Sequence, residues 1–115
     1  MQIYYNPRCS KCREAYTLLK EGGIDAEIID YLKQPPSIET LKNIVTVLGI
    51  KPSELVRKKE PLYIEKYAGK KISNTRWLTI LSKNPILIQR PIVIDGNKAI
   101  IGRPPELVLE LVLKA

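Results

Sequence analysis

The only two cysteines of the chain, Cys9 and Cys12, lie three residues apart in the segment YNPRCSKCR (residues 5–13). Because a thiolate is both a nucleophile and a redox group, this pair makes thiol chemistry the first hypothesis. Cα atoms three apart on the first turn of a helix also lie near the ~5.5 Å that a disulfide prefers. Cysteines that merely fill a core, or half of a zinc site, are the alternatives. Since the chain has no histidine and no third cysteine, we expect no metal site.

The residues around Cys9 predict that its sulfur is ionised. Met1–Tyr5 has the β-branched and aromatic character of a strand, Asn6-Pro7 breaks it, and apolar residues recur at helical spacing from Ser10. Cys9 is therefore expected at a helix N-terminus, where unpaired N–H groups and the helix dipole favour a negative charge. Three cations flank it in sequence: Arg8, Lys11 and Arg13. Such surroundings commonly lower a thiol pKa from ~8.5 to roughly 3.5–7.5.

The composition narrows the classes of function. The absence of histidine excludes Ser-His-Asp and Cys-His catalysis. A formal charge of +7 favours anionic ligands, either nucleic acid or a small oxyanion or anionic cosubstrate such as glutathione. No Gly-aromatic run typical of a nucleic-acid-binding sheet is present, so no direct nucleic-acid partner is expected.

The sequence also predicts where the protein works. It has no apolar run near the ~18 residues of a membrane span and no signal peptide, so we expect a cytoplasmic protein without a membrane partner. Structural disulfides are rare in that compartment. A paired cysteine motif there points to transient, catalytic or sensing use.

The hydrophobic pattern predicts strands toward both ends of the chain and helices between them. The expected strands are 1–5, 26–30, 91–94 and 98–101, the last two joined by an Asp95-Gly96-Asn97 turn, and the expected helices are 10–22, 37–48, 52–56, 60–67, 74–82 and 106–113. The order β-α-β, helices, β-β-α predicts an α/β, thioredoxin-like fold with a mixed four-stranded sheet and an all-helical insertion. We expect one domain over 1–115, with its core at about 1–32 and 86–115 and the insertion at about 33–85.

Three arginines lie near turns: Arg57, Arg90 and Arg103. In a thioredoxin-like arrangement the loop before the third strand approaches the cysteine-bearing helix, which places Arg90 near Cys9 and predicts a cis Arg90-Pro91 bond. Guanidinium groups gathered there would bind a tetrahedral oxyanion and hold the thiolate. The alternative is that each arginine is a surface residue or forms a structural ion pair, for instance with Asp95 or Glu106.

Four segments of the chain resemble the glutaredoxin-linked arsenate reductases, within the superfamily that also holds the Spx regulators and the YffB proteins. The segments are YYNPRC (4–9), LVRK (55–58), NPILIQRPIV (84–93) and GRP (102–104). Their order and spacing cover nearly the whole chain. The resemblance implies a thioredoxin-like fold with a helical insertion.

The resemblance also implies the roles of the site residues. Cys9, in the Asn-Pro-x-Cys motif, would be the nucleophile, and Arg57, Arg90 and Arg103 would bind the oxyanion. Asn6 would hold the loop or donate a hydrogen bond to the sulfur. In such enzymes the cysteine attacks arsenate, glutathione displaces the arsenic adduct and glutaredoxin resolves the mixed disulfide, with no bound cofactor.

Cys12 is where the sequence departs from the best-known reductases, which lack a cysteine at this position. A second thiol there could resolve a Cys9 adduct internally as a Cys9-Cys12 disulfide. The Spx regulators carry Cys-x-x-Cys in a similar setting and bind RNA polymerase, so an Spx-like redox sensor is one alternative. A glutathione-dependent thiol reductase that does not act on arsenate is another. Gly102-Arg103-Pro104, with the full set of arginines, resembles the reductases more closely.

Overall fold

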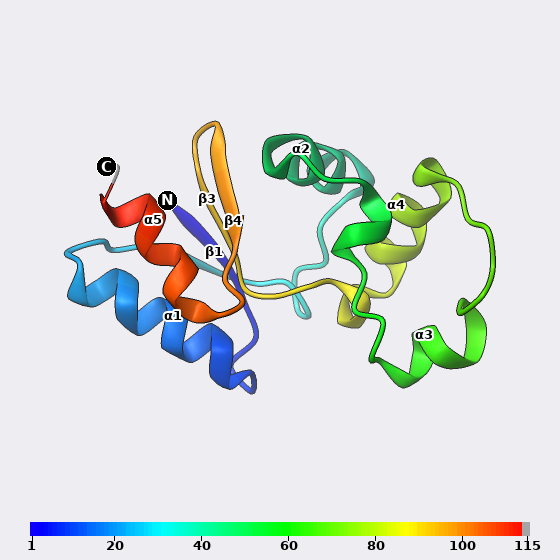
Figure 1. The fold of residues 1–115 in the computed structure, drawn as a ribbon, viewed down its shortest axis with the longest axis horizontal. Helices are drawn as coiled ribbons and strands as arrows, with labels where there is room; N and C mark the ends of the chain where they lie inside the picture. The colour runs from blue at the N-terminus through cyan, green and yellow to red at the C-terminus, as the bar shows by residue number, and fades with distance from the viewer. Residues whose placement is uncertain (114–115) are drawn as a thin grey trace. The chain divides into compact units, whose positions relative to one another are not determined.

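The computed structural model describes residues 1–113 and divides the chain into two compact units. The first, the sheet unit, comprises Met1–Gln34 and Arg90–Ala115, and the second, the helical unit, comprises Pro35–Gln89. Helices within the described part of the chain are too short or too polar to cross a membrane. The first unit contains all four strands of the described chain, and the second contains α2, α3 and α4 (Figure 1).

The sheet unit contains a mixed four-stranded sheet. Its elements are β1 (Gln2–Tyr5), α1 (Ser10–Glu21), β2 (Glu27–Asp30), β3 (Ile92–Asp95), β4 (Lys98–Ile101), the 3₁₀ turn η3 (Pro105–Val108) and α5 (Leu109–Leu113). The strand order is β2-β1-β3-β4, with β1 parallel to β2 and both other pairs antiparallel. This is the predicted α/β, thioredoxin-like arrangement.

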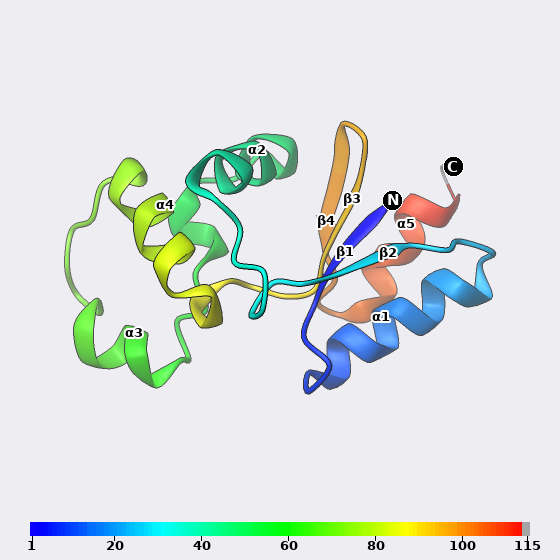
Figure 2. The same ribbon diagram turned by 180° about the vertical axis from the view of Figure 1, so that it is seen from behind.

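One face of the sheet is covered by α1, η3 and α5, which lie beside each other in both views (Figures 1 and 2). The register places Ile3 beside Val93, so both side chains point to this face. The core that forms there consists of Ile3, Ala15, Leu19, Ala26, Val93, Val108 and Leu111. Leu18 is only half-buried at the edge of this core.

The hairpin β3–β4 forms as its sequence predicts. Asp95 pairs with Lys98, which leaves Gly96 and Asn97 as a two-residue loop. Gly96 has φ of 61°, a backbone conformation that such tight loops require and glycine adopts without strain. The loop therefore fixes the register of the hairpin, which places the start of β3 beside the end of β4.

The C-terminal helix differs from its prediction. Residues 106–113 were expected to form one helix, but the structure has η3 followed by α5. Pro104 and Pro105 supply no backbone N–H, and the N–H of Leu107 bonds to the carbonyl of Pro104 at 3.1 Å, which tightens the first turn into a 3₁₀ turn. Val108 and Leu111 are buried against the sheet unit's core.

The helical unit has no strand among its described elements, as predicted. It contains α2 (Ile38–Leu48), the 3₁₀ turn η1 (Pro52–Leu55), α3 (Pro61–Lys66), α4 (Asn74–Lys83) and the 3₁₀ turn η2 (Pro85–Leu87). Ser37 caps α2 by accepting a hydrogen bond from the Thr40 N–H, and Gly49 ends the helix with φ of 70°. Fully buried aliphatic side chains hold the helices together: Leu41, Ile44, Leu55, Leu81 and Leu87.

Candidate active site

The loop that carries Cys9 is held by Asn6. The Asn6 carbonyl accepts a hydrogen bond from the Cys9 N–H at 2.9 Å, and its side-chain Oδ1 accepts one from the Arg8 N–H at 3.0 Å. Asn6 is the one buried polar residue among the described core positions, with 9% of its surface exposed. Both bonds fix the turn after β1, and Cys9 follows it as the N-cap of α1 in extended conformation.

Arg13 adds a second restraint on this loop. Its guanidinium donates a hydrogen bond to the carbonyl of Pro7 at 2.7 Å. The sequence predicted Arg13 only as one of the cations around Cys9. Arg13 lies six residues after Pro7, in the first turns of the helix, and this position was the sequence signal that its long side chain could reach back to the loop.

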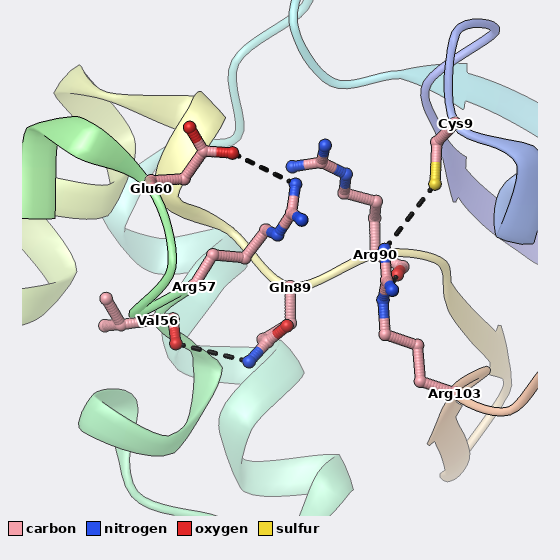
Figure 3. Close-up of polar contacts among 7 residues, drawn as sticks. All are labelled: Cys9, Val56, Arg57, Glu60, Gln89, Arg90 and Arg103. Atoms are coloured by element: carbon pink, nitrogen blue, oxygen red, sulfur yellow. Dashed lines mark hydrogen bonds and ion pairs between the residues drawn. The ribbon is translucent and has the colours of Figure 1, made fainter.

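Two arginines from the other end of the chain reach Cys9. A terminal nitrogen of Arg103 lies 3.6 Å from the Cys9 Sγ, and the Arg103 Nε donates to the Arg90 carbonyl at 2.6 Å (Figure 3). The Arg90 side chain also helps to lower the pKa of the Cys9 thiol. The structure thus brings three predicted site residues together within the sheet unit.

Both arginines precede a cis proline. The cis bond predicted at Arg90-Pro91 is confirmed, and Arg103-Pro104 is also cis. The second was not predicted, although the dipeptide is the same. These bonds lie just before β3 and just after β4, at the end of the hairpin away from its loop.

Gly102 explains how Arg103 is placed. Its N–H donates to the Pro91 carbonyl at 2.8 Å. A Cβ at this position would lie 2.9 Å from the Pro91 Cγ and 3.0 Å from Val108 Cγ1, closer than packed carbons approach. A residue without a side chain is therefore needed for the segment before Arg103 to pack against Pro91.

The pKa of the Cys9 thiol is lower than that of an ordinary cysteine. Burial alone raises it, but the opposing effects are larger in sum: the backbone N–H and the thiol of Cys12, a hydrogen bond from Arg90 and the positive charge of Arg103. The Cys9 side chain makes no capping hydrogen bond, and no single one of these groups accounts for the lowered pKa. Cys9 is poised to act as a thiolate.

The pKa of Cys12 moves in the opposite direction. Its side chain is fully buried, and burial, with the neighbouring Cys9, raises the pKa to about 12, although the Asn6 backbone and Arg90 oppose the shift. Both thiols are free in the structure. Near neutral pH, Cys12 therefore carries the proton while Cys9 is the nucleophile of the pair.

Arg57 lies in the helical unit. Its guanidinium forms an ion pair with the Glu60 carboxylate at 3.1 Å, and both side chains are mostly buried (Figure 3). Its own N–H donates to the Leu87 carbonyl at 2.7 Å, which fixes the backbone after η1. The sequence suggested Asp95 or Glu106 as ion-pair partners for the arginines; the i,i+3 spacing of Arg57 and Glu60 was the signal for this pair.

The site has the parts needed for nucleophilic attack on an anion. A thiol with a lowered pKa lies at the start of α1. The Arg103 guanidinium contacts its sulfur and Arg90 also helps to lower its pKa, and both guanidinium groups can hold an oxyanion. Within residues 1–113, no group of three or more cysteine, aspartate or glutamate side chains is arranged to hold a metal ion.

Comparison with known proteins identifies the family. The profile described as the ArsC family matches residues 4–111. The chain is 46% identical to the uncharacterized protein YfgD of Escherichia coli (97% of this chain, 96% of that one) and 42% identical to an arsenate reductase of Haemophilus influenzae (95% and 96%). Among solved structures, an arsenate reductase from Vibrio cholerae superposes with a TM-score of 0.91 at 42% identity, over 95% of this chain and 94% of that one. The chain therefore belongs to the ArsC family of arsenate reductase-like proteins, with a thioredoxin-like fold.

Proposed function

We propose that the protein is an arsenate reductase that uses Cys9 as its nucleophile. The observation that carries the proposal is that the Arg103 guanidinium contacts the Cys9 sulfur, while Arg90 also helps to lower the pKa of that thiol. The same guanidinium groups that stabilise a thiolate can bind an incoming oxyanion and the charge that develops on it. The relatives named arsenate reductase, at about the same length, support arsenate as that oxyanion.

The first step is attack by the Cys9 thiolate on As(V). A sulfur–arsenic bond forms and one arsenate oxygen leaves as water, which takes up two protons. Glutathione thiol then attacks the Cys9 sulfur; the sulfur–arsenic bond breaks with its electron pair on arsenic, which is released as arsenite, As(III). The two sulfurs are oxidised to a Cys9–glutathione disulfide, so the two electrons gained by arsenic are accounted for.

The enzyme then returns to its thiol form. A glutaredoxin thiol attacks the glutathione sulfur of the mixed disulfide, and the Cys9 thiolate leaves. No bound cofactor takes part. Cys12 offers a second route, because its thiol could attack the Cys9 sulfur, expel glutathione and leave a Cys9–Cys12 disulfide for an external thiol to reduce. Its raised pKa makes this route slow near neutral pH, since the thiolate is the attacking form.

Arg57 and Asn6 complete the proposed site. The resemblance to the reductases supports Arg57 as the third guanidinium on the oxyanion. Asn6 is proposed as the residue that keeps the Cys9 loop in shape, which its two hydrogen bonds to the loop support.

The test is arsenate-dependent oxidation of NADPH in the presence of glutathione, glutathione reductase and glutaredoxin. We expect turnover by the wild type, none by Cys9→Ser, and nearly full turnover by Cys12→Ser. Loss of turnover in both variants would assign resolution to the internal disulfide. A wild type that reduces glutathionylated substrates but shows no arsenate-dependent turnover would replace the proposal with a general glutathione-dependent thiol reductase.

A further inference from the structure

Two short segments of the helical unit, residues 55–57 and 87–89, run antiparallel beside each other, with Val56 opposite Ile88. Two backbone hydrogen bonds flank this pair: from the Arg57 N–H to the Leu87 carbonyl at 2.7 Å, and from the Gln89 N–H to the Leu55 carbonyl at 2.8 Å. In a pair flanked in this way, the two residues that face each other exchange no hydrogen bond. The Val56 carbonyl therefore needs a donor from outside the pairing.

The Gln89 side chain supplies that donor. Its Nε2 donates to the Val56 carbonyl at 3.2 Å, and Figure 3 shows the amide turned toward this oxygen. Val56 is only 1% exposed, so bulk water does not reach its carbonyl. Because a buried acceptor without a donor is unfavourable, this contact holds the Gln89 side chain in place.

The peptide unit between Val56 and Arg57 is thus held at both edges. Its carbonyl accepts a hydrogen bond from the Gln89 side chain, and its N–H donates one to the Leu87 carbonyl. A peptide unit is planar and rigid, so two bonds on opposite edges fix its orientation. The Cα of Arg57 follows directly from this plane. The same two bonds therefore set where the Arg57 side chain begins.

The far end of the Arg57 side chain has a different restraint. Its guanidinium pairs with the Glu60 carboxylate at 3.1 Å. An oxyanion bound by this guanidinium competes with Glu60, so that contact weakens when the anion binds. The hydrogen bond from Gln89 lies at the other end of the residue and persists. A side chain with a fixed starting point loses less conformational freedom on binding, which favours the bound state.

We propose that Gln89 is a positioning residue for Arg57, which it orients for oxyanion binding through the Val56 carbonyl. The inference rests on the proposed function in taking Arg57 as a ligand of the oxyanion. Gln89 carries neither charge nor nucleophile, so its role is exerted through the backbone. A glutamine that only satisfied a buried carbonyl would stabilise the helical unit and leave oxyanion binding unchanged.

The first test measures binding without turnover. Arsenate is titrated calorimetrically into the Cys9→Ser protein, which keeps the arginines but cannot form the sulfur–arsenic bond. In this background, Gln89→Met keeps the length of the side chain and removes the donor, so we expect the Kd for arsenate to rise about 5- to 10-fold, the effect of one hydrogen bond. Gln34→Met, the same change at an exposed glutamine, should leave the Kd unchanged. An unchanged Kd in the Gln89→Met protein would overturn the proposal.

Arg57→Ala shows whether Gln89 acts through Arg57. We expect Arg57→Ala to weaken arsenate binding, and Gln89→Met to add no further loss in that protein, because the residue that it positions is gone. Equal losses with and without Arg57 would overturn the inference and leave the proposed function standing. If Arg57→Ala itself does not weaken binding, the proposed role of Arg57 fails and the inference fails with it.

Amide hydrogen exchange tests the link between Gln89 and the peptide unit directly. Gln89→Asn is a milder change that keeps the amide but shortens the side chain by one methylene group. We expect the Arg57 N–H to exchange about 5- to 10-fold faster in this variant relative to the amides of α2, which report the stability of the same unit. Acceleration of both to the same extent would mean that Gln89 only stabilises the unit, and the proposal would be wrong.

Discussion

The sheet unit holds both thiols of the chain, whereas the helical unit holds almost all of its excess charge. Residues 35–89 contain ten lysines and arginines against four acidic residues, a formal charge of +6, and the rest of the sequence contains nine against eight, a charge of +1. The two units are similar in length, so the difference does not follow from size. The reactive group therefore lies in a part of the chain that is nearly neutral.

This difference separates two explanations of the Cys9 thiolate. A high net charge would stabilise any nearby anion weakly and would be screened by salt within ~10 Å. In the sheet unit, the backbone N–H and thiol of Cys12 and the side chains of Arg90 and Arg103 instead act on the Cys9 sulfur as individual neighbouring groups. Placement of individual groups at Cys12, Arg90 and Arg103, not overall charge, lowers the pKa of Cys9. The following variants test that conclusion.

Arg103→Ala is expected to have the largest effect. It removes the guanidinium at 3.6 Å from the sulfur, so the pKa of Cys9 should rise, and kcat/KM for arsenate should fall by about 10²–10³-fold. The pKa is measured from the pH dependence of iodoacetamide labelling. Arg76→Ala removes the same charge from an exposed position in the helical unit and should change neither quantity. Similar effects in the two variants would indicate that the net charge of the protein, and not the contact with Arg103, lowers the pKa of Cys9.

Cys12 makes the stability of the protein sensitive to alkaline pH. The unfolded thiol loses its proton near pH ~8.5, whereas the native one holds it to about pH 12. The stabilisation is therefore complete below pH ~8.5 and is lost as the pH rises toward about 12, at about 1.4 kcal/mol per pH unit. Urea unfolding of wild type and Cys12→Ala between pH 8 and 11 measures how steeply the free energy of unfolding falls with pH in each protein. The same dependence on pH in both proteins would contradict the conclusion that Cys12 keeps its proton in the folded state.

Gly102→Ala is expected to destabilise the protein by about 1–3 kcal/mol, the usual effect of overpacking. The added methyl would press on Pro91 and Val108 and move Arg103, so the pKa of Cys9 should also rise. Gly49→Ala is the matched change in the helical unit, where the strain comes from φ of 70° and no atom lies within 4 Å of the new Cβ. It should lower stability in urea unfolding without changing the Cys9 pKa. A Cys9 pKa in Gly102→Ala equal to that of the wild type would show that this glycine does not position Arg103.

Glu60→Gln is expected to have the smallest effect. It removes the carboxylate that pairs with Arg57 at 3.1 Å, so an oxyanion no longer competes with Glu60 for the guanidinium. We expect the KM for arsenate to fall by about 2- to 3-fold, in line with the modest strength of such pairs. Glu65→Gln, on the exposed side of α3, serves as the control. An unchanged KM would mean that Arg57 does not bind the substrate.

Local sequence signals predicted most of the fold. Ser37 and Gly49 mark both ends of α2, and Gly96 marks the hairpin loop, because capping and positive φ depend on a few neighbouring residues. The split between η3 and α5 was not predicted. Apolar residues that share one face have a similar spacing in a 3₁₀ turn and in the first turn of an α-helix, so their pattern does not distinguish the two.

The candidate site could be predicted only in part. The lowered pKa of Cys9 follows from its place at a helix start, and the proximity of Arg90 follows from the topology. Arg103 is 94 residues from Cys9 in sequence. Its place near a turn singled it out, and the resemblance to the reductases implied its role. The function of Gly102 depends on packing against Pro91 and Val108, which no local pattern encodes.

The hairpin loop Gly96-Asn97 lies at the opposite end of β3 and β4 from Arg90 and Arg103. Four residues of strand, about 13 Å, separate it from either arginine. A fluorophore attached at Asn97 would thus be a handle on the sheet that leaves the reacting sulfur untouched. Both cysteines of the chain lie in its motif, so a dye that reacts with an alkyne- or azide-bearing residue at position 97, and not with thiols, would leave them unlabelled.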